Sequence, residues 1–349
     1  MKVVVSISRI LIIGLGSIGN RHLRLARQFF PQADIRILRH QLGSSVPVNA
    51  NGVFFHIDEA IAFAPHIAVI SSPAPFHIAT AQALAKIGVH LLIEKPLSSS
   101  LSGVRQLLEL VRHRETVLQT GYNLRFLPSL MRFRDLLAEG VIGEVLSVRC
   151  EIGQYLPSWR PDSNYRLGVS AQRQLGGGAL LELSHELDYM RWIFGEVDWV
   201  KATTSRQSRL DIDVEDTVHL TLGFVPKVNA IQTIAVLNLD FIRHDTTRLC
   251  VAIGDKGSLR WNGLTGMVDL YEMGANQWKE FYSHPHQRDD SYLAEWQNFI
   301  DCVTGHKTPL VTGEDGLKVL EIIEAARISA KSGQHVSVAD LFQSDEVQK

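Results

Sequence analysis

A charged pair and a proline directly follow an apolar run in the first third of the chain. The segment LLIEKP, residues 91–96, reads as a buried strand that ends in Glu94, Lys95 and Pro96. Burying an ammonium group is costly unless it is paired or used, and proline cannot continue a central sheet ladder. Either the strand stops here and Lys95 is solvated, or this end of the strand is a working surface.

A second stretch that could bind a ligand is the glycine turn GLGSIG, residues 14–19. It follows an apolar strand and opens a helix. In a dinucleotide-binding turn the first glycine makes the bend, the second admits the pyrophosphate and the third allows close helix packing. The helix N-terminus then offers free N–H groups to phosphate. We favour this interpretation over a simple tight turn. Its candidate cofactor-binding residues are Gly14, Gly16, Ser17, Ile18 and Gly19.

The acid that normally completes this fingerprint is absent. It is expected about 20 residues on, at the end of the second strand, and twenty residues after Gly19 comes Arg39. Asp34 lies before that strand, at the wrong end. An arginine suits a 2′-phosphate, so we predict NADP(H) as the preferred cofactor and NAD(H) as the alternative. Arg39 could instead stack on adenine or face water. Arg39 and its neighbour His40 are the candidate contacts.

The elements that must position these residues alternate between strands and helices in the first third of the chain. We predict strands at 10–13, 35–38, 67–70, 89–93 and 116–120 and helices at 18–30, 76–87 and 101–113. Short apolar strands between amphipathic helices imply a parallel sheet covered on both faces. The fold class is therefore α/β, with an N-terminal doubly wound Rossmann domain over residues 1–122.

The pattern of predicted strands and helices changes after about residue 121. Two helices are predicted at 128–139 and 179–194, and two more at 292–303 and 314–332. Between them come β-like runs at 214–224, 228–239, 248–253, 258–261 and 267–271 without intervening helices. Such a succession favours a large, mainly antiparallel sheet. We therefore expect an α+β domain for substrate binding and oligomerisation over residues 123–349.

Composition excludes several classes of protein. A net charge of -2 over 349 residues gives no overall pull toward nucleic acid or anionic membrane. The 3 cysteines form no CxxC pair, which fits a reducing cytosol better than a disulfide framework. The apolar N-terminus is interrupted by charges and reads as a strand rather than a signal peptide. We expect a cytoplasmic protein without a membrane span.

Several motifs together resemble the Gfo/Idh/MocA oxidoreductases, the family of glucose–fructose oxidoreductase and inositol dehydrogenase. They are GLGSIG (14–19), SSPAPFH (71–77), EKP (94–96), GYNLRFLP (121–128), LGGGALLELSHELDYMRWIFG (175–195) and GEDGLKVLEIIEAARISAKSGQ (313–334). The similarity covers nearly the whole chain in order. The segment QYLPSWRPDSNYR (154–166), which precedes the glycine run, resembles a bacterial sugar or nucleotide-sugar subgroup.

The resemblance implies that Lys95 lies beside the nicotinamide and touches the reacting substrate hydroxyl. It also implies a cis Lys95–Pro96 bond. The family often has Thr-Pro-Asn after the strand that ends near residue 70, where this chain has Ser72-Pro73-Ala74. An asparagine contact to the cofactor is therefore lost or replaced. The expected cofactor contacts at this edge are Ser71, Ser72, Pro73, His77, Glu94, Lys95 and Pro96, although His77 could equally be a simple helix-start histidine.

The resemblance makes His185 the acid/base candidate, because the family carries an H-x-x-D pattern here. Imidazole titrates near neutrality and can take and return a proton. Glu182, His185 and Asp188 would share one helical stripe, and Asp188 would orient His185 or only pack. Many relatives have an aspartate at the position of Leu181, and Glu182 points in another direction. A zinc motif HExxH is excluded because Tyr189 replaces its second histidine.

An aromatic and basic segment precedes this helix. Arginines with aromatic rings suit a sugar that bears carboxylate or phosphate, although a solvated surface loop would look the same. The candidate substrate contacts are Tyr155, Trp159, Arg160, Tyr165 and Arg166, with Arg125 as a further anion contact. We expect a sugar-type small molecule as substrate, no nucleic acid or membrane partner, no metal, and a homodimer or homotetramer through the second sheet.

The leading hypothesis is an NAD(P)-dependent oxidoreductase for a CH–OH group of a sugar, sugar acid, nucleotide sugar or cyclitol, with Lys95 and His185 at the reacting oxygen. One alternative keeps the cofactor bound for a net redox-neutral elimination, epimerisation or glycoside cleavage. Another is a non-catalytic dinucleotide-sensing regulator, against which the retained Lys95 and His185 argue.

Overall fold

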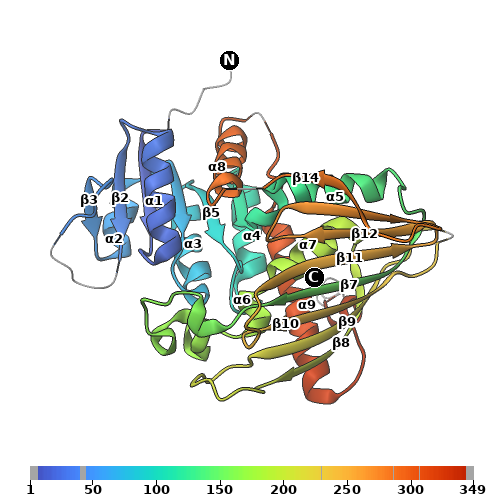
Figure 1. The fold of residues 1–349 in the computed structure, drawn as a ribbon. Helices are drawn as coiled ribbons and strands as arrows, with labels where there is room; N and C mark the ends of the chain where they lie inside the picture. Colours follow the sequence, from blue (N-terminus) through green and yellow to red (C-terminus); the bar gives the residue numbers. More distant parts are fainter. Residues whose placement is uncertain (1–6, 40–44, 229, 286, 306, 343–349) are drawn as a thin grey trace. The chain divides into compact units, whose positions relative to one another are not determined.

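The chain divides into two compact units (Figure 1). The computed structural model describes residues 7–39, 45–228, 230–285, 287–305 and 307–342. Unit 1 consists of Met1–Tyr122 and Tyr292–Leu320, and unit 2 of Asn123–Ser291 and Glu321–Lys349. The long helix α9 (Gly313–Ser332) passes from one unit into the other. The sequence analysis places all of 123–349 in the second domain, whereas the segment from Tyr292 to Leu320 clusters with the first.

Unit 1 is built on a six-stranded parallel sheet. Its strands run in the order β3-β2-β1-β4-β5-β6. They are β1 (Arg9–Ile13), β2 (Asp34–Leu38), β3 (Gly52–Phe54), β4 (Ile67–Ile70), β5 (His90–Glu94) and β6 (Leu118–Gly121). The helices are α1 (Ser17–Phe29), α2 (Ile57–Phe63), α3 (His77–Ala85), α4 (Val104–His113) and α8 (Asp290–Val303). The strand order reverses between β1 and β4, which is where doubly wound sheets bind ligands.

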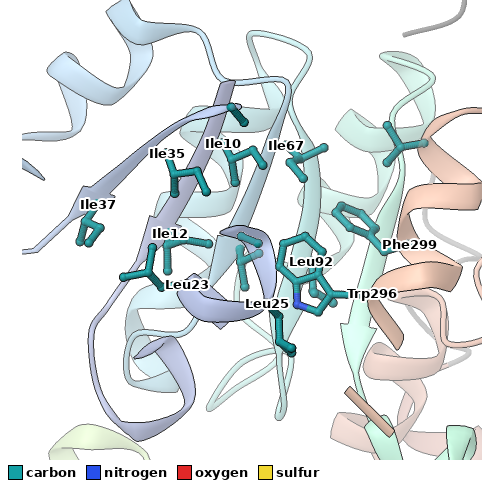
Figure 2. Packing of buried hydrophobic residues seen from close by; sticks show 14 residues of the cluster. Ile10, Ile12, Leu23, Leu25, Ile35, Ile37, Ile67, Leu92, Trp296 and Phe299 are labelled. Atoms are coloured by element: carbon teal, nitrogen blue, oxygen red, sulfur yellow. The ribbon is translucent and has the colours of Figure 1, made fainter. Parts of the chain in front are cut away.

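The core of unit 1 explains why the late segment returns to it. Strands covered on both faces carry continuous apolar runs, and Ile10 and Ile12 of β1 are fully buried. Figure 2 shows Trp296 and Phe299 of α8 packed among these strand side chains and the α1 side chain Leu23. Since Trp296 is 0% exposed, α8 is part of this core although it is about 170 residues away from β6 in sequence.

Unit 2 is built on a nine-stranded sheet with the order β14-β13-β12-β11-β7-β10-β9-β8-β15. Its strands are β7 (Val145–Gly153), β8 (Val197–Ser205), β9 (Thr217–Phe224), β10 (Ile234–Asp240), β11 (Thr247–Gly254), β12 (Gly257–Asn262), β13 (Met267–Glu272), β14 (Lys279–Ser283) and β15 (Val336–Ser337). Its helices are α5 (Pro128–Ala138), α6 (Ala179–Glu182), α7 (His185–Phe194) and α10 (Val338–Phe342), with the last part of α9. The strands pair antiparallel except β7 with β10, which are parallel.

One face of the second sheet packs against helices. Trp261 of β12 donates its indole N–H to Ser129 Oγ of α5 at 3.0 Å, and its ring meets Tyr189 of α7 at 5.4 Å between centroids. On β10, Ala235 and Leu237 are buried, whereas Val236 between them is exposed. This alternation is typical of a strand with one covered face.

The predicted fold class is confirmed: a parallel Rossmann sheet and a mainly antiparallel second sheet. The sequence analysis missed the strands β3, β7, β8, β14 and β15 and the helices α2 and α10. It also expected one helix over 179–194, where α6 and α7 are separated at Leu183 and Ser184. Within the described residues, no helix is both long and apolar enough to cross a bilayer.

Candidate active site

The glycine turn after β1 has the geometry of a phosphate cradle. Gly14 has φ +86°, and a Cβ there would lie 2.8 Å from the Ser71 carbonyl oxygen. A Cβ on Gly19 would collide with the Gly14 carbonyl oxygen. At Gly16, by contrast, a Cβ would meet nothing within 4 Å. Two glycines are thus required by packing, and the middle one leaves open space at the N-terminus of α1, where the exposed Ser17 begins the helix.

The loop after β4 lies against this turn. Ser71 Oγ donates to the carbonyl oxygens of Ile13 at 2.8 Å and Gly14 at 3.1 Å, which joins the ends of β4 and β1. Ser72 Oγ is buried, and the described residues offer it no hydrogen-bond partner. Because buried hydroxyls are normally hydrogen-bonded, this atom fits a contact to a bound ligand.

The end of β2 presents Arg39 rather than an acid. Arg39 directly follows the strand and is half-buried. Its backbone N–H donates to Phe54 O at 3.1 Å, and its guanidinium donates to Ser45 O at 3.2 Å. Asp34 lies at the other end of β2 and is held by Arg36 at 2.6 Å. The predicted contact His40 lies outside the described residues.

Lys95 follows β5 at the same edge of the sheet. It is half-buried, and the Lys95–Pro96 bond is cis, as the resemblance implied. The Lys95 backbone N–H donates to Glu94 Oε2 at 3.1 Å. The strand therefore ends at Glu94, whose carboxylate turns back onto the backbone of the next residue.

His77 joins two loops of this edge. Its Nε2 lies 2.6 Å from the Ser72 carbonyl oxygen, and its Nδ1 lies 3.1 Å from that of Pro96. Burial lowers the pKa of His77, while the Ser72 carbonyl acts in the opposite direction. The structure therefore places His77 inside unit 1 as a tie between the β4 and β5 loops.

The histidine segment of unit 2 differs from the expected single helix. α6 ends at Glu182 and α7 begins at His185, so a stripe of Glu182, His185 and Asp188 along one helix is wrong. Glu182 accepts a hydrogen bond from Ser170 Oγ at 2.9 Å. Asp188 binds the guanidinium of Arg125 at 2.6 and 2.9 Å. His185 is half-buried at the first position of α7, with Asp188 one turn later.

The aromatic and basic segment before α6 folds onto its own neighbours. Tyr155 packs on His244 with centroids 4.2 Å apart, and the Trp159 indole donates to Gln154 O at 3.0 Å. Arg166 pairs with Asp211 at 3.0 Å. Two further candidates, Arg160 and Tyr165, are exposed and half-buried respectively.

Two family models match the chain. One, described as the NAD-binding Rossmann fold of an oxidoreductase family, covers residues 8–122. The other, described as the C-terminal alpha/beta domain of that family, covers residues 134–338. The chain belongs to the Gfo/Idh/MocA oxidoreductase family.

Curated relatives and solved structures agree with this assignment. An uncharacterized oxidoreductase of Synechocystis is 30% identical over 203 residues, 54% of this chain and about half (53%) of that protein. Myo-inositol 2-dehydrogenase of Thermotoga maritima is 28% identical over 282 residues, 78% of this chain and 80% of that one. Levoglucosan dehydrogenase in complex with NADH superposes with a TM-score of 0.80 at 21% identity, over 94% of this chain and 98% of that chain, which shows the shared fold.

As a Gfo/Idh/MocA oxidoreductase, the chain should hold a dinucleotide, and the residues of unit 1 fit one. The open space at Gly16 admits a pyrophosphate, the N-terminus of α1 offers N–H groups, and Ser72 Oγ is a buried hydroxyl that a ligand could satisfy. Arg39 lies where the adenosine ribose is recognised in this fold. These features support a nicotinamide cofactor.

The sequence analysis missed three buried polar residues of unit 1: His22 of α1 and Glu295 and Trp296 of α8. All three are 0% exposed. His22 Nε2 lies 2.8 Å from Glu94 Oε1, so it connects directly to the Glu-Lys-Pro motif. The sequence signal was weak, since His22 sits on the apolar side of an amphipathic helix and its two hydrogen-bond partners, Glu94 and Trp296, come 72 and 274 residues later.

Proposed function

We propose that this oxidoreductase transfers a hydride between a nicotinamide cofactor and a carbinol or ketone carbon of a sugar, sugar acid, nucleotide sugar or cyclitol. The observation that carries the proposal is the edge of the unit 1 sheet. The strands β1 and β5 are parallel strands of one sheet, so the Gly16 turn after β1 and Lys95 after β5 follow the same ends of its strands. The myo-inositol and levoglucosan dehydrogenases named above support a polyol-type substrate.

The residues have distinct proposed roles. A bound nicotinamide would accept or supply the hydride, which the side chains of the protein cannot do by themselves. The Lys95 ammonium donates a hydrogen bond to the reacting oxygen and fixes its place. His185 takes the hydroxyl proton when the carbinol is oxidised and returns it when the ketone is reduced. Asp188, one turn after His185 on α7, is paired with Arg125. Its proposed role is therefore to hold α7, and with it His185, in place.

We further propose NADP(H) as the preferred form of the cofactor. The support is the charge at the end of β2, where Arg39 is half-buried and the acid of that strand, Asp34, is at the opposite end and paired with Arg36. A guanidinium favours a 2′-phosphate, whereas a carboxylate would favour the free 2′-hydroxyl.

The first experiment is a fluorescence titration of the protein with NADPH and NADH, after released cofactor has been assayed in denatured samples. We expect binding of both with NADPH tighter. A folded, cofactor-free protein that binds neither would contradict the proposal and favour a regulatory protein. Cofactor carried through purification, with turnover that leaves its redox state unchanged, would favour a redox-neutral reaction.

The second experiment tests the two catalytic residues on the substrate that a polyol and sugar screen yields. Lys95→Ala and His185→Ala should each lower kcat by about 10²-fold or more, the usual contribution of a positioned acid/base group. The matched control is Lys86→Ala, an exposed lysine after α3. Full activity in Lys95→Ala or His185→Ala would refute that residue's role.

A further inference from the structure

A buried chain of hydrogen bonds in unit 1 ends at the backbone of Lys95. Trp296 donates its indole N–H to His22 Nδ1 at 2.9 Å. His22 Nε2 lies 2.8 Å from Glu94 Oε1, and Glu94 Oε2 accepts the Lys95 backbone N–H at 3.1 Å. Trp296 and His22 are 0% exposed and Glu94 is 7% exposed. The hydrogen-bond chain thus joins three segments that lie far apart in sequence: α8, α1 and the end of β5.

The donors and acceptors fix the tautomer of His22. An indole N–H can only donate, so His22 Nδ1 must be the unprotonated acceptor. The single proton of the neutral ring is then on Nε2, where it is donated to Glu94. Glu94 receives two N–H groups, as a carboxylate does. Each bond therefore sets the direction of the next, from the indole to the Lys95 amide.

The same cluster could be mistaken for a metal site. One ligand atom each from His22, Glu94 and Glu295 lie within 4.8 Å of one another, and all three residues are buried. A metal would need the lone pair of His22 Nε2, which carries the proton in this tautomer. Burial, and then the Glu94 charge, raise the pKa of Glu295 well above its usual range, which disfavours the carboxylate that a cation would bind. The arrangement favours a hydrogen-bond chain over a cation.

A buried histidine lies on each side of Lys95. His22 holds the preceding residue through the Glu94 side chain, and His77 faces the following residue at the Pro96 carbonyl oxygen, 3.1 Å away. We propose that Trp296, His22 and Glu94 are positioning residues that fix the Lys95 backbone, and with it the place of the Lys95 ammonium, through the indole-selected tautomer of His22. This inference rests on the proposed role of Lys95 at the reacting oxygen.

The decisive variant is Trp296→Phe, which removes one N–H and keeps an aromatic ring in the core. Its matched control is Trp261→Phe, which removes an equally buried indole N–H bond, to Ser129, in unit 2. Three readouts are compared in full-length protein: thermal stability, the rate of Lys95 acylation measured by peptide mass spectrometry against exposed Lys86, and kcat with KM. Acylation requires neither substrate nor cofactor.

Both variants should lose similar thermal stability, because each loses one buried hydrogen bond. Only Trp296→Phe should change the rate of Lys95 acylation several-fold, and it should lower kcat by about tenfold with KM nearly unchanged, because small misplacements of a catalytic group reduce turnover. Equal Lys95 acylation and kcat in the two variants would overturn the positioning role.

A measurement on the wild-type protein keeps the inference testable if Trp296→Phe does not fold. Long-range ¹H–¹⁵N NMR of the histidine rings, with His22 assigned through His22→Gln, should show a bare Nδ1 and a protonated Nε2. The opposite tautomer, or stoichiometric Zn²⁺ bound at His22, would overturn it. Failure of the proposed role of Lys95 would give a different result. In that case Lys95→Ala would keep full turnover, while the difference in Lys95 acylation between the two tryptophan variants would persist.

Discussion

Arg125 and Asp188 form a two-pronged ion pair in the interior of unit 2. Arg125 Nε lies 2.9 Å from Asp188 Oδ2, and Arg125 Nη2 lies 2.6 Å from Asp188 Oδ1. Their side chains are 3% and 1% exposed. The ring of Trp192 lies 5.6 Å from the guanidinium carbon. The sequence analysis predicted the Arg125 guanidinium as a contact for a substrate anion, but its charge is offset by Asp188. Asp188 lies on α7, three residues after His185.

Asp188→Asn should therefore destabilise the protein by about 3–5 kcal/mol, because the variant leaves the Arg125 charge buried without a counter-charge. Urea denaturation of the full chain measures this loss. Glu139→Gln is the matched control: its pair with Arg132 has a similar length, 2.7 Å, but the carboxylate is 52% exposed. That surface pair should contribute at most about 1 kcal/mol. Equal losses in the two variants would contradict the assignment.

Gly16→Ala should separate cofactor binding from folding. Since a Cβ at Gly16 meets nothing in the protein, stability should fall by no more than about 1 kcal/mol, the cost of alanine at a helix N-cap. The methyl group would occupy the space that a pyrophosphate needs, so Kd for NAD(P)H should rise by about tenfold or more. Differential scanning fluorimetry and cofactor titration measure the two effects.

Gly19→Ala is the comparison, because its Cβ collides with the Gly14 carbonyl oxygen. That variant should lose stability even without cofactor. Unchanged dinucleotide affinity in Gly16→Ala would count against the cradle.

Arg39→Asp should weaken NADPH more than NADH. Loss of a charge-assisted hydrogen bond costs about 1.5–3 kcal/mol, which corresponds to roughly 10- to 100-fold in Kd. The new carboxylate would also repel the 2′-phosphate and accept from a free 2′-hydroxyl. Parallel titrations with the two cofactors measure the ratio. An equal loss for both would refute a role of Arg39 at the 2′-phosphate.

Glu295→Gln should raise stability at high pH. In the unfolded chain Glu295 ionises near its ordinary pKa of about 4.3, whereas burial and Glu94 raise the pKa in the folded protein. The stability linked to this proton is fully present below the unfolded pKa and is lost as pH rises toward the folded one. Glutamine cannot ionise and keeps the shape of the neutral acid.

The advantage of Glu295→Gln over wild type should thus grow as the pH rises above about 5, by up to about 1.4 kcal/mol per pH unit. Urea denaturation at several pH values measures it, with exposed Glu115→Gln as the control. A difference that does not change with pH would show that Glu295 is ionised in the folded protein.

Much of unit 1 could be predicted because its signals are local. The apolar runs of β1, β4 and β5 predict strands buried on both faces, and the glycine spacing around Gly16 predicts a strand–turn–helix unit. The strands β7 and β8 were missed because half-buried strands carry shorter apolar patterns than fully buried ones. The assembly of the second sheet into a homo-oligomer stays a prediction.

The sequence by itself determined the two-part α/β architecture, the family and the positions of Lys95, His185 and the glycine turn, since these depend on periodicity and motifs read over a few residues. Only the tertiary structure decided what surrounds them. It broke the predicted helix between Glu182 and His185, paired Arg125 with Asp188, and brought Trp296 to His22 behind Lys95. Hydrogen bonds between residues far apart in sequence depend on tertiary packing. Packing decides which polar groups are buried next to one another, and buried polar groups are normally hydrogen-bonded.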